Sequence, residues 1–354
     1  MNAQPICVLG MRSGSSLATR ALALLGADAG PEAHLMPGVS GDNPKGFWEQ
    51  QPLVDLNEDL LAALGGPWWD PPPLPDGWHE DPRLDWFRER ARNLVSELFP
   101  EGGMWVWKDP RAAVTLPLWQ AAIGPMRYVV AARSPADVAS SLHARDAVWH
   151  PWLESSRLYF RYLLAGLRNT ARADRIVLFY DGWFDDLDAQ IARLARFATG
   201  APPSAAAAAA VGEFFESALR HHDAGAQSGE LDPETAVAYE VLREGTDAAG
   251  HLDVRAEERF DTEWRALRER LGEDSTELRA RARAAWLVAH GERRLREAEA
   301  QAREAEARAR EAEGEQRAAE LERANRWVHD MNASVSWRLT APLRRAKRLT
   351  LRRG

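Results

Sequence analysis

Cysteine is almost missing from this sequence, and a long apolar run is missing altogether. Cys7 is the one cysteine, so neither an internal disulfide nor a cage of cysteines around a metal ion can form. No stretch approaches the roughly 18 uninterrupted apolar residues that a membrane-spanning helix needs. A strand-like run begins at Ile6, which leaves no room for a signal peptide. We therefore expect a protein of the reducing cytoplasm.

Lysine is also scarce, because only Lys45, Lys108 and Lys347 are found among 45 basic residues. In a chain that otherwise uses arginine, a lysine inside a motif suggests that a compact ammonium group is needed there. The charge is unevenly spread. Residues 331–354 carry seven basic side chains and no acidic one, so the remainder of this chain of net charge −8 carries −15. Such an acidic body argues against bulk nucleic-acid binding, and only the tail is suited to polyanions.

Residues 1–222 alternate between strand and helix patterns. Four short apolar runs are typical of buried parallel strands: Ile6–Gly10, Met104–Trp107, Arg127–Ala132 and Arg175–Tyr180. Helical periodicity is found at 16–25, 50–64, 82–98, 135–146, 154–171 and 184–198, and Ser204 is placed to cap a further helix. This order predicts an α/β fold of three layers, a parallel sheet with helices on both faces. Such sheets bind ligands at the carboxyl ends of their strands.

The rest of the chain differs in composition. Residues 223–274 read as a linker and helical neck, and residues 275–330 are a repeat of Arg, Glu and Ala that predicts a long charged helix. Its alanine seam would make a weak coiled coil, while its Glu–Arg pairs four residues apart support a lone helix equally well. Residues 331–354 form a basic tail in which Trp337, Leu339, Leu343 and Leu349 indicate an amphipathic end.

The strongest chemical signal is the loop between the first strand and the first helix. Arg12, Ser13, Gly14, Ser15 and Ser16 lie in this loop and at the start of the helix. A short glycine-containing loop before a helix directs backbone N–H groups to one spot, where the helix dipole adds positive charge. This predicts a site for a phosphate-like anion. The Gly-Lys-Ser/Thr of a Walker A loop is missing, and a plain tight turn is the structural alternative.

A second motif follows the third predicted strand. Arg133 lies at the carboxyl end of that strand, and Ser141 lies about two turns along a helix that Pro135 opens. A guanidinium and a hydroxyl placed in this way could hold a second phosphate. Taken alone, an exposed arginine and a helix serine would be the simpler interpretation.

Together the two motifs resemble the sulfotransferases that use 3′-phosphoadenosine 5′-phosphosulfate (PAPS). The first resembles their 5′-phosphosulfate loop and the second their 3′-phosphate signature. Asn43–Glu49 and Trp107–Arg111 are similar to segments of the bacterial, Golgi and tyrosylprotein branch, and Val177–Gly200 is similar to a later strand and helix. The likeness spans about residues 5–222, within a P-loop-like sulfotransferase fold. The loop before Arg12 is one residue shorter than is usual in this family.

The resemblance implies a donor substrate and a set of roles. PAPS would be held by Arg12, Ser13, Gly14, Ser15 and Ser16 at one end and by Arg133 and Ser141 at the other. Glu49 would be the catalytic base, with Asp109 and His34 as alternatives, while Lys108 and Arg12 would steady the leaving phosphate. No catalytic metal is expected. An ion-paired strand end at Lys108 and a helix-terminal charge at Glu49 remain the structural alternatives.

The acceptor and the partners are less well defined by the sequence. Tryptophans near the expected binding edge, Trp48, Trp68, Trp69, Trp78, Trp149 and Trp152, could stack on sugars and favour a carbohydrate acceptor, although packing explains most of them equally well. The tail resembles the ends of enzymes that build bacterial surface polysaccharides. This implies that residues 275–330 join copies or an assembly complex, and that residues 331–354 contact the anionic inner membrane. A kinase-like phosphoryl transferase and a non-catalytic nucleotide-binding scaffold are the alternative functions.

Overall fold

The computed structural model describes residues 5–39, 43, 46–100, 103–145, 152–219 and 229–273, together with residues 310 and 314. These ranges, except for the last two residues, belong to a compact unit that spans Met1–Ala284. The predicted long charged helix at 275–330 and the basic tail at 331–354 lie outside the described residues, apart from those same two positions. Among the described residues, no helix is both long and apolar enough to cross a membrane.

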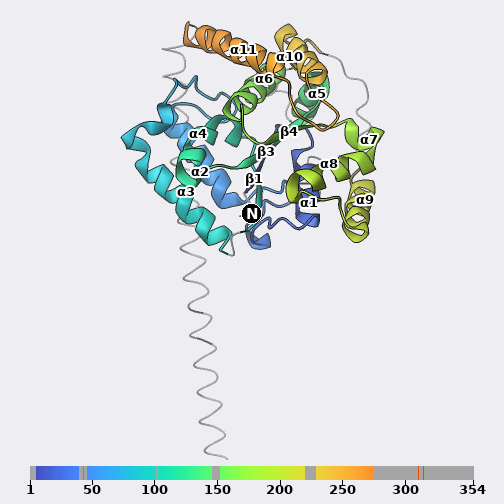
Figure 1. Cartoon of the computed structure of the whole chain (residues 1–354). Helices are drawn as coiled ribbons and strands as arrows, with labels where there is room; N and C mark the ends of the chain where they lie inside the picture. The colour runs from blue at the N-terminus through green and yellow to red at the C-terminus, as the bar shows by residue number, and fades with distance from the viewer. Residues whose placement is uncertain are drawn as a thin grey trace, which may run out of the picture. The chain divides into compact units, whose positions relative to one another are not determined.

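A parallel sheet of four strands lies at the centre of this unit (Figure 1). Its strands are β1 (Ile6–Leu9), β2 (Val106–Lys108), β3 (Arg127–Ala132) and β4 (Arg175–Phe179), in the order β2-β1-β3-β4. Each neighbouring pair is parallel, and the register sets Val8 of β1 beside both Lys108 and Val129. The four predicted strands are therefore confirmed to within two residues at each end.

Alternate residues of the strands face two separate hydrophobic cores. Ile6 and Val8 face a core that includes side chains of α1 (Ser15–Leu24), α8 (Leu187–Thr199) and α9 (Ala205–Leu219). Cys7 and Leu9 face the larger core on the other side. The helices that contribute to it include α2 (Gln51–Leu64), α3 (Asp85–Leu98), α4 (Ala112–Ile123), α5 (Pro135–Arg145) and α6 (Trp152–Asn169). Figure 1 shows the two groups of helices on either side of the sheet, as the three-layer α/β prediction requires.

Short elements complete the chain path. The 3-10 helices η1 (Glu32–His34), η2 (Trp78–Glu80) and η3 (Pro82–Leu84) lie in the connections around α2 and α3, and α7 (Gly182–Asp185) follows β4. Ser204 caps α9 as predicted, because its Oγ accepts a hydrogen bond of 3.1 Å from the backbone N–H of Ala207.

Two parts of the fold differ from the pattern expected from the sequence. Helix α4 was not predicted, because most of its residues are apolar and buried and so show no helical periodicity, and because it contains Pro117, a residue that disfavours helix interiors. The stretch predicted as a linker and helical neck contains the helices α10 (Pro233–Glu244) and α11 (Val254–Glu273). Leu242 and Phe260 of these helices are buried in the same core as α6, so the compact unit extends beyond residue 222.

Candidate active site

The loop between β1 and α1 is pressed closely against the sheet. Gly10 and Gly14 have φ angles of 134° and 83°, and Arg12 also lies in the left-handed region at 54°. A Cβ atom on Gly10 would lie 2.5 Å from the carbonyl oxygen of Ala131, and one on Gly14 would lie 2.6 Å from the ring of Tyr180. Glycine is therefore required at both positions by backbone conformation and by space.

Three serine hydroxyls fix this loop from within. Ser13 donates to the carbonyl of Ala131 on β3 at 2.7 Å, and Ser15 donates to the carbonyl of Gly10 at 2.8 Å. Ser16 donates to the carbonyl of Phe47 at 3.0 Å. The Ser13 hydroxyl thus points to the sheet, whereas Ser15 and Ser16 also line the pocket described below. No described side chain caps the first turn of α1, so its backbone N–H groups are placed to meet an anion.

The second predicted motif lies at the carboxyl end of β3. The hydroxyl of Tyr159 donates to the carbonyl of Arg133 at 2.9 Å and accepts from its backbone N–H at 3.1 Å, which holds the strand end. The guanidinium of Arg133 lies over the ring of Tyr180, with 4.2 Å to the ring centre. Its buried Nε lies 3.5 Å from Asp137 and has no hydrogen-bond partner among the described residues.

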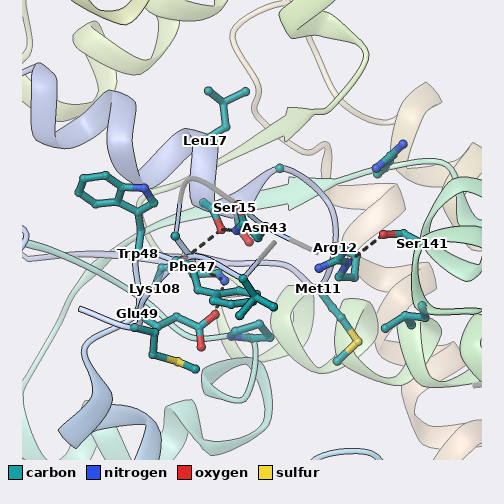
Figure 2. A pocket seen from close by; sticks show the side chains of 18 of the residues that line it. Met11, Arg12, Ser15, Leu17, Asn43, Phe47, Trp48, Glu49, Lys108 and Ser141 are labelled. Atoms are coloured by element: carbon teal, nitrogen blue, oxygen red, sulfur yellow. Dashed lines mark hydrogen bonds and ion pairs between the residues drawn. The ribbon is translucent and has the colours of Figure 1, made fainter. Parts of the chain in front are cut away.

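The two motifs meet directly. The Nε of Arg12 donates to the Oγ of Ser141 at 2.9 Å, although the two residues are 129 positions apart. Figure 2 shows this pair on one side of the pocket and Glu49 beside Lys108 on the other. Arg133 lines the same pocket, so both cationic motifs face one cavity.

Opposite this pair lies a buried network of charged groups. The Nζ of Lys108 is in direct ionic contact with the carboxylate of Glu49 and lies 3.4 Å from the carbonyl of Phe47. Arg111 lies between three carboxylates, at 3.5 Å from Glu49, 2.8 Å from Glu58 and 3.0 Å from Asp109. Glu49 is only 4% exposed. Burial raises the pKa of the Glu49 carboxyl above its ordinary value, and the Lys108 ammonium opposes this rise.

The two alternative bases occupy different surroundings. Asp109 is fully buried, and Asn57 donates to its Oδ2 at 2.8 Å while the backbone N–H of Arg111 donates to its Oδ1 at 2.9 Å. Both carboxylate oxygens of Asp109 are therefore already used to hold the end of β2. His34 is exposed and lies in η1. Of the three candidates, Glu49 is the one that lines the pocket.

The pocket itself has a volume of about 470 Å³. One end is formed by the β1–α1 loop, Arg133, Ser141, Arg145 and Tyr180, and two phenylalanines of α9 also line the pocket. The other end is formed by Glu49, Glu58, Trp68, Lys108, Arg111 and Tyr162. Of the tryptophans considered as acceptor contacts, Trp48 and Trp68 line the pocket, while Trp149 lies outside the described residues.

Several pocket residues were missed in the sequence. Arg111 and Tyr180 carried a usable signal, because Arg111 closely follows one predicted strand and Tyr180 is the last residue of another, and ligands bind at such strand ends. Glu58 and Tyr162 carried none, because they come from the middle of α2 and α6 and reach the pocket only through packing. Within the described ranges, no group of three or more His, Cys, Asp or Glu side chains is placed to hold a metal ion.

No protein-family model matches the chain, and no curated protein matches it significantly. Among solved structures, the sulfotransferase STF9 from Mycobacterium avium is 15% identical with a TM-score of 0.39, covering 75% of this chain and 77% of its own. The sulfotransferase domain of the Synechococcus PCC 7002 olefin synthase is 17% identical with a TM-score of 0.37, covering 74% and 94%. A retinol dehydratase in complex with androsterone and the inactive cofactor PAP is 16% identical with a TM-score of 0.36, covering 78% and 83%. Because these similarities are weak, the function of this chain has to be inferred from its own residues.

Proposed function

We propose that this protein is a sulfotransferase that moves the sulfuryl group of PAPS to a hydroxyl of an acceptor, which we infer to be a carbohydrate. The observation that carries the proposal is the meeting of Arg12, Arg133 and Ser141 in one pocket, from two motifs far apart in the sequence. A donor with separate phosphate groups on the 3′ and 5′ oxygens of its ribose needs two cationic sites that share a cavity. A single-phosphate ligand would not need the second.

The residues present fit such a donor. Gly14 lets the loop lie close to the ring of Tyr180, and the first-turn N–H groups of α1 begin directly after it without a side-chain cap. Near the other cationic site, the buried Nε of Arg133 has no hydrogen-bond partner among the described residues and could bond an anionic oxygen. Arg12, Gly14, Ser15 and Ser16 would hold the 5′-phosphosulfate, and Arg133 and Ser141 the 3′-phosphate. Ser13 would act through its position in the loop, because its hydroxyl is bonded to Ala131.

PAPS, when bound, supplies a sulfuryl group whose bond to the phosphate oxygen breaks as a bond to the acceptor oxygen forms. Negative charge then grows on the departing phosphate. Arg12 and the N–H groups of the loop can stabilise it, and Lys108 can reach it with a compact positive charge. The products are 3′,5′-adenosine bisphosphate and a sulfate ester. No redox change occurs.

The proton of the acceptor hydroxyl must also be removed, and Glu49 is placed to take it. Burial raises the pKa of its carboxyl, which makes the carboxylate a stronger base. The ionic contact with Lys108 keeps Glu49 in the charged form that can accept a proton. When Lys108 turns towards the leaving phosphate, the carboxylate loses this partner, so base strength and leaving-group stabilisation rise together.

Calorimetry with 3′,5′-adenosine bisphosphate, 5′-AMP and ATP tests this proposal. We expect the bisphosphate to bind at least tenfold more tightly than 5′-AMP, because one or two additional charge-assisted hydrogen bonds contribute about that much binding free energy. Arg133→Ala and Ser141→Ala should remove most of that preference. Arg92→Ala and Ser96→Ala, which change exposed residues of α3, are the matched controls and should leave it intact. Equal affinity for the bisphosphate and 5′-AMP would overturn the proposal.

The alternative functions predict different results in binding and turnover assays. A kinase-like enzyme would prefer ATP and would require Mg²⁺, whereas sulfuryl transfer should continue in EDTA. A non-catalytic scaffold would tolerate Glu49→Gln in a turnover assay, whereas the enzyme should lose turnover and keep its affinity for the bisphosphate. The roles suggested for residues 275–330 in assembly and for residues 331–354 at an anionic membrane stay predictions.

A further inference from the structure

The end of the pocket around Glu49 is unusual in its balance of charge. Three carboxylates, those of Glu49, Glu58 and Asp109, lie with two cations, Lys108 and Arg111, in one connected network. Lys108 contacts Glu49, and Arg111 contacts all three carboxylates. Among the described residues of this network, carboxylates therefore outnumber cations by one.

Glu58 is the carboxylate best placed to meet a ligand. Asp109 is fully buried beneath the pocket wall, and Glu49 is paired with Lys108. The Glu58 side chain lines the pocket, is 19% exposed, and reaches Arg111 through one oxygen at 2.8 Å. It projects from α2, a different element from the β2 end that carries Lys108, Asp109 and Arg111. The charge of Glu58 therefore comes from a separate element and is not part of the motif at the end of β2.

The opposite end of the pocket has the reverse charge. Arg12, Arg133 and Arg145 line it, and no carboxylate of the described residues lines that end. An aromatic wall of Trp68 and Tyr162 adjoins Glu58, and the Tyr162 hydroxyl is held by the carbonyl of Trp68 at 2.7 Å. Such a wall suits the apolar face of a sugar ring. Both carboxylates that line the described pocket, those of Glu49 and Glu58, therefore lie at the same end.

We propose that the end lined by Glu58 and Trp68 binds uncharged or amino-bearing glycosides and rejects glycosides that carry a carboxylate, with Glu58 as the residue that sets this preference. The inference rests on the proposed function, since it takes the basic end as the donor site. A uronic acid would bring a second carboxylate close to Glu58, in a half-buried setting where like charges repel more strongly than in water.

The test uses the full chain saturated with 3′,5′-adenosine bisphosphate, so that an anionic probe cannot simply occupy the basic end. Binding of three matched glycosides is measured by ligand-observed NMR: phenyl β-D-glucoside, phenyl β-D-glucuronide and phenyl 2-amino-2-deoxy-β-D-glucoside. We expect the neutral and amino glycosides to bind at least about fivefold more tightly than the glucuronide, the effect of one nearby like charge. A glucuronide that binds as tightly as the glucoside, or failure of all three to bind, would overturn the inference.

Glu58→Gln assigns the preference to this residue. It should raise the affinity for the glucuronide about three- to fivefold and leave the glucoside within twofold. Glu97→Gln is the matched control, because Glu97 is also paired with an arginine, at 3.0 Å, but its side chain is exposed on α3 and does not line the pocket. An unchanged glucuronide affinity in Glu58→Gln would show that Glu58 does not set the preference. If the bisphosphate itself fails to bind, the proposed function fails instead.

Discussion

The two ends of the pocket are built by different physical means. At the basic end, backbone conformation, glycine and neutral hydroxyl contacts place the groups, as in the bond from Arg12 to Ser141. At the other end, charges hold one another in place. Lys108, Glu49 and Arg111 are all nearly buried, and each has an oppositely charged partner.

This difference bears on how each end should respond to change. A hydroxyl contact contributes about 1 kcal/mol, and its loss is local. A buried charge left without its partner costs about 3–5 kcal/mol, and its neighbours change protonation in response. Substitutions in the charge network should therefore have large effects on turnover and on its pH dependence, while those in the loop should have graded effects on donor affinity.

Lys108→Ala should have the largest effect. We expect turnover to fall by about 100- to 1000-fold, because a charge that stabilises the leaving phosphate is lost. The acidic limb of the pH–rate profile should also move to higher pH. Lys108 lowers the pKa of Glu49, so its removal raises that pKa further, and the active carboxylate then disappears at a higher pH. The measurement is kcat/KM against pH.

Lys108→Arg, which keeps the charge, is the control for that experiment and should leave the limb near its original position. A limb that moves to lower pH in Lys108→Ala would contradict Glu49 as the group that titrates.

Gly14→Ala should have an intermediate effect. The new Cβ would lie 2.6 Å from Tyr180, at a backbone φ of 83° that side chains disfavour. Because the loop and the ring must both shift, the affinity for 3′,5′-adenosine bisphosphate should fall at least tenfold by calorimetry. Gly26→Ala tests the backbone contribution alone, since Gly26 has a φ of 102° and open space around its Cβ. An unchanged affinity for the bisphosphate in Gly14→Ala would show that the β1–α1 loop does not bind the donor.

Ser13→Ala should have the smallest effect on the site. Its hydroxyl donates to the carbonyl of Ala131, so we expect a loss of about 1 kcal/mol in the free energy of unfolding. Donor affinity should stay within about threefold of the original, in contrast to Ser141→Ala. Denaturant unfolding of both variants measures the change in stability, and calorimetry measures the change in donor affinity. A tenfold loss of donor affinity in Ser13→Ala would instead show that this hydroxyl contacts the donor.

The sequence predicted those parts of the fold that depend on local pattern. The strands were found because short apolar runs lie between helical patterns, and the basic end of the pocket because Arg12 and Arg133 each follow a strand. Helix α4 was missed because it is buried on nearly all sides. The charge network was only half visible. Lys108 and Glu49 stood out in motifs, but Glu58 reaches Arg111 across 53 positions, which no local pattern records.

The left-handed backbone of Arg12 has a consequence for how this chain can vary. An arginine in that conformation costs about 1–2 kcal/mol, which glycine would avoid. A chain selected for folding alone would therefore tend to place glycine at this position. The bond from Arg12 to Ser141 offsets only part of this backbone cost, so an arginine at position 12 fits the role that we propose for its charge in donor binding.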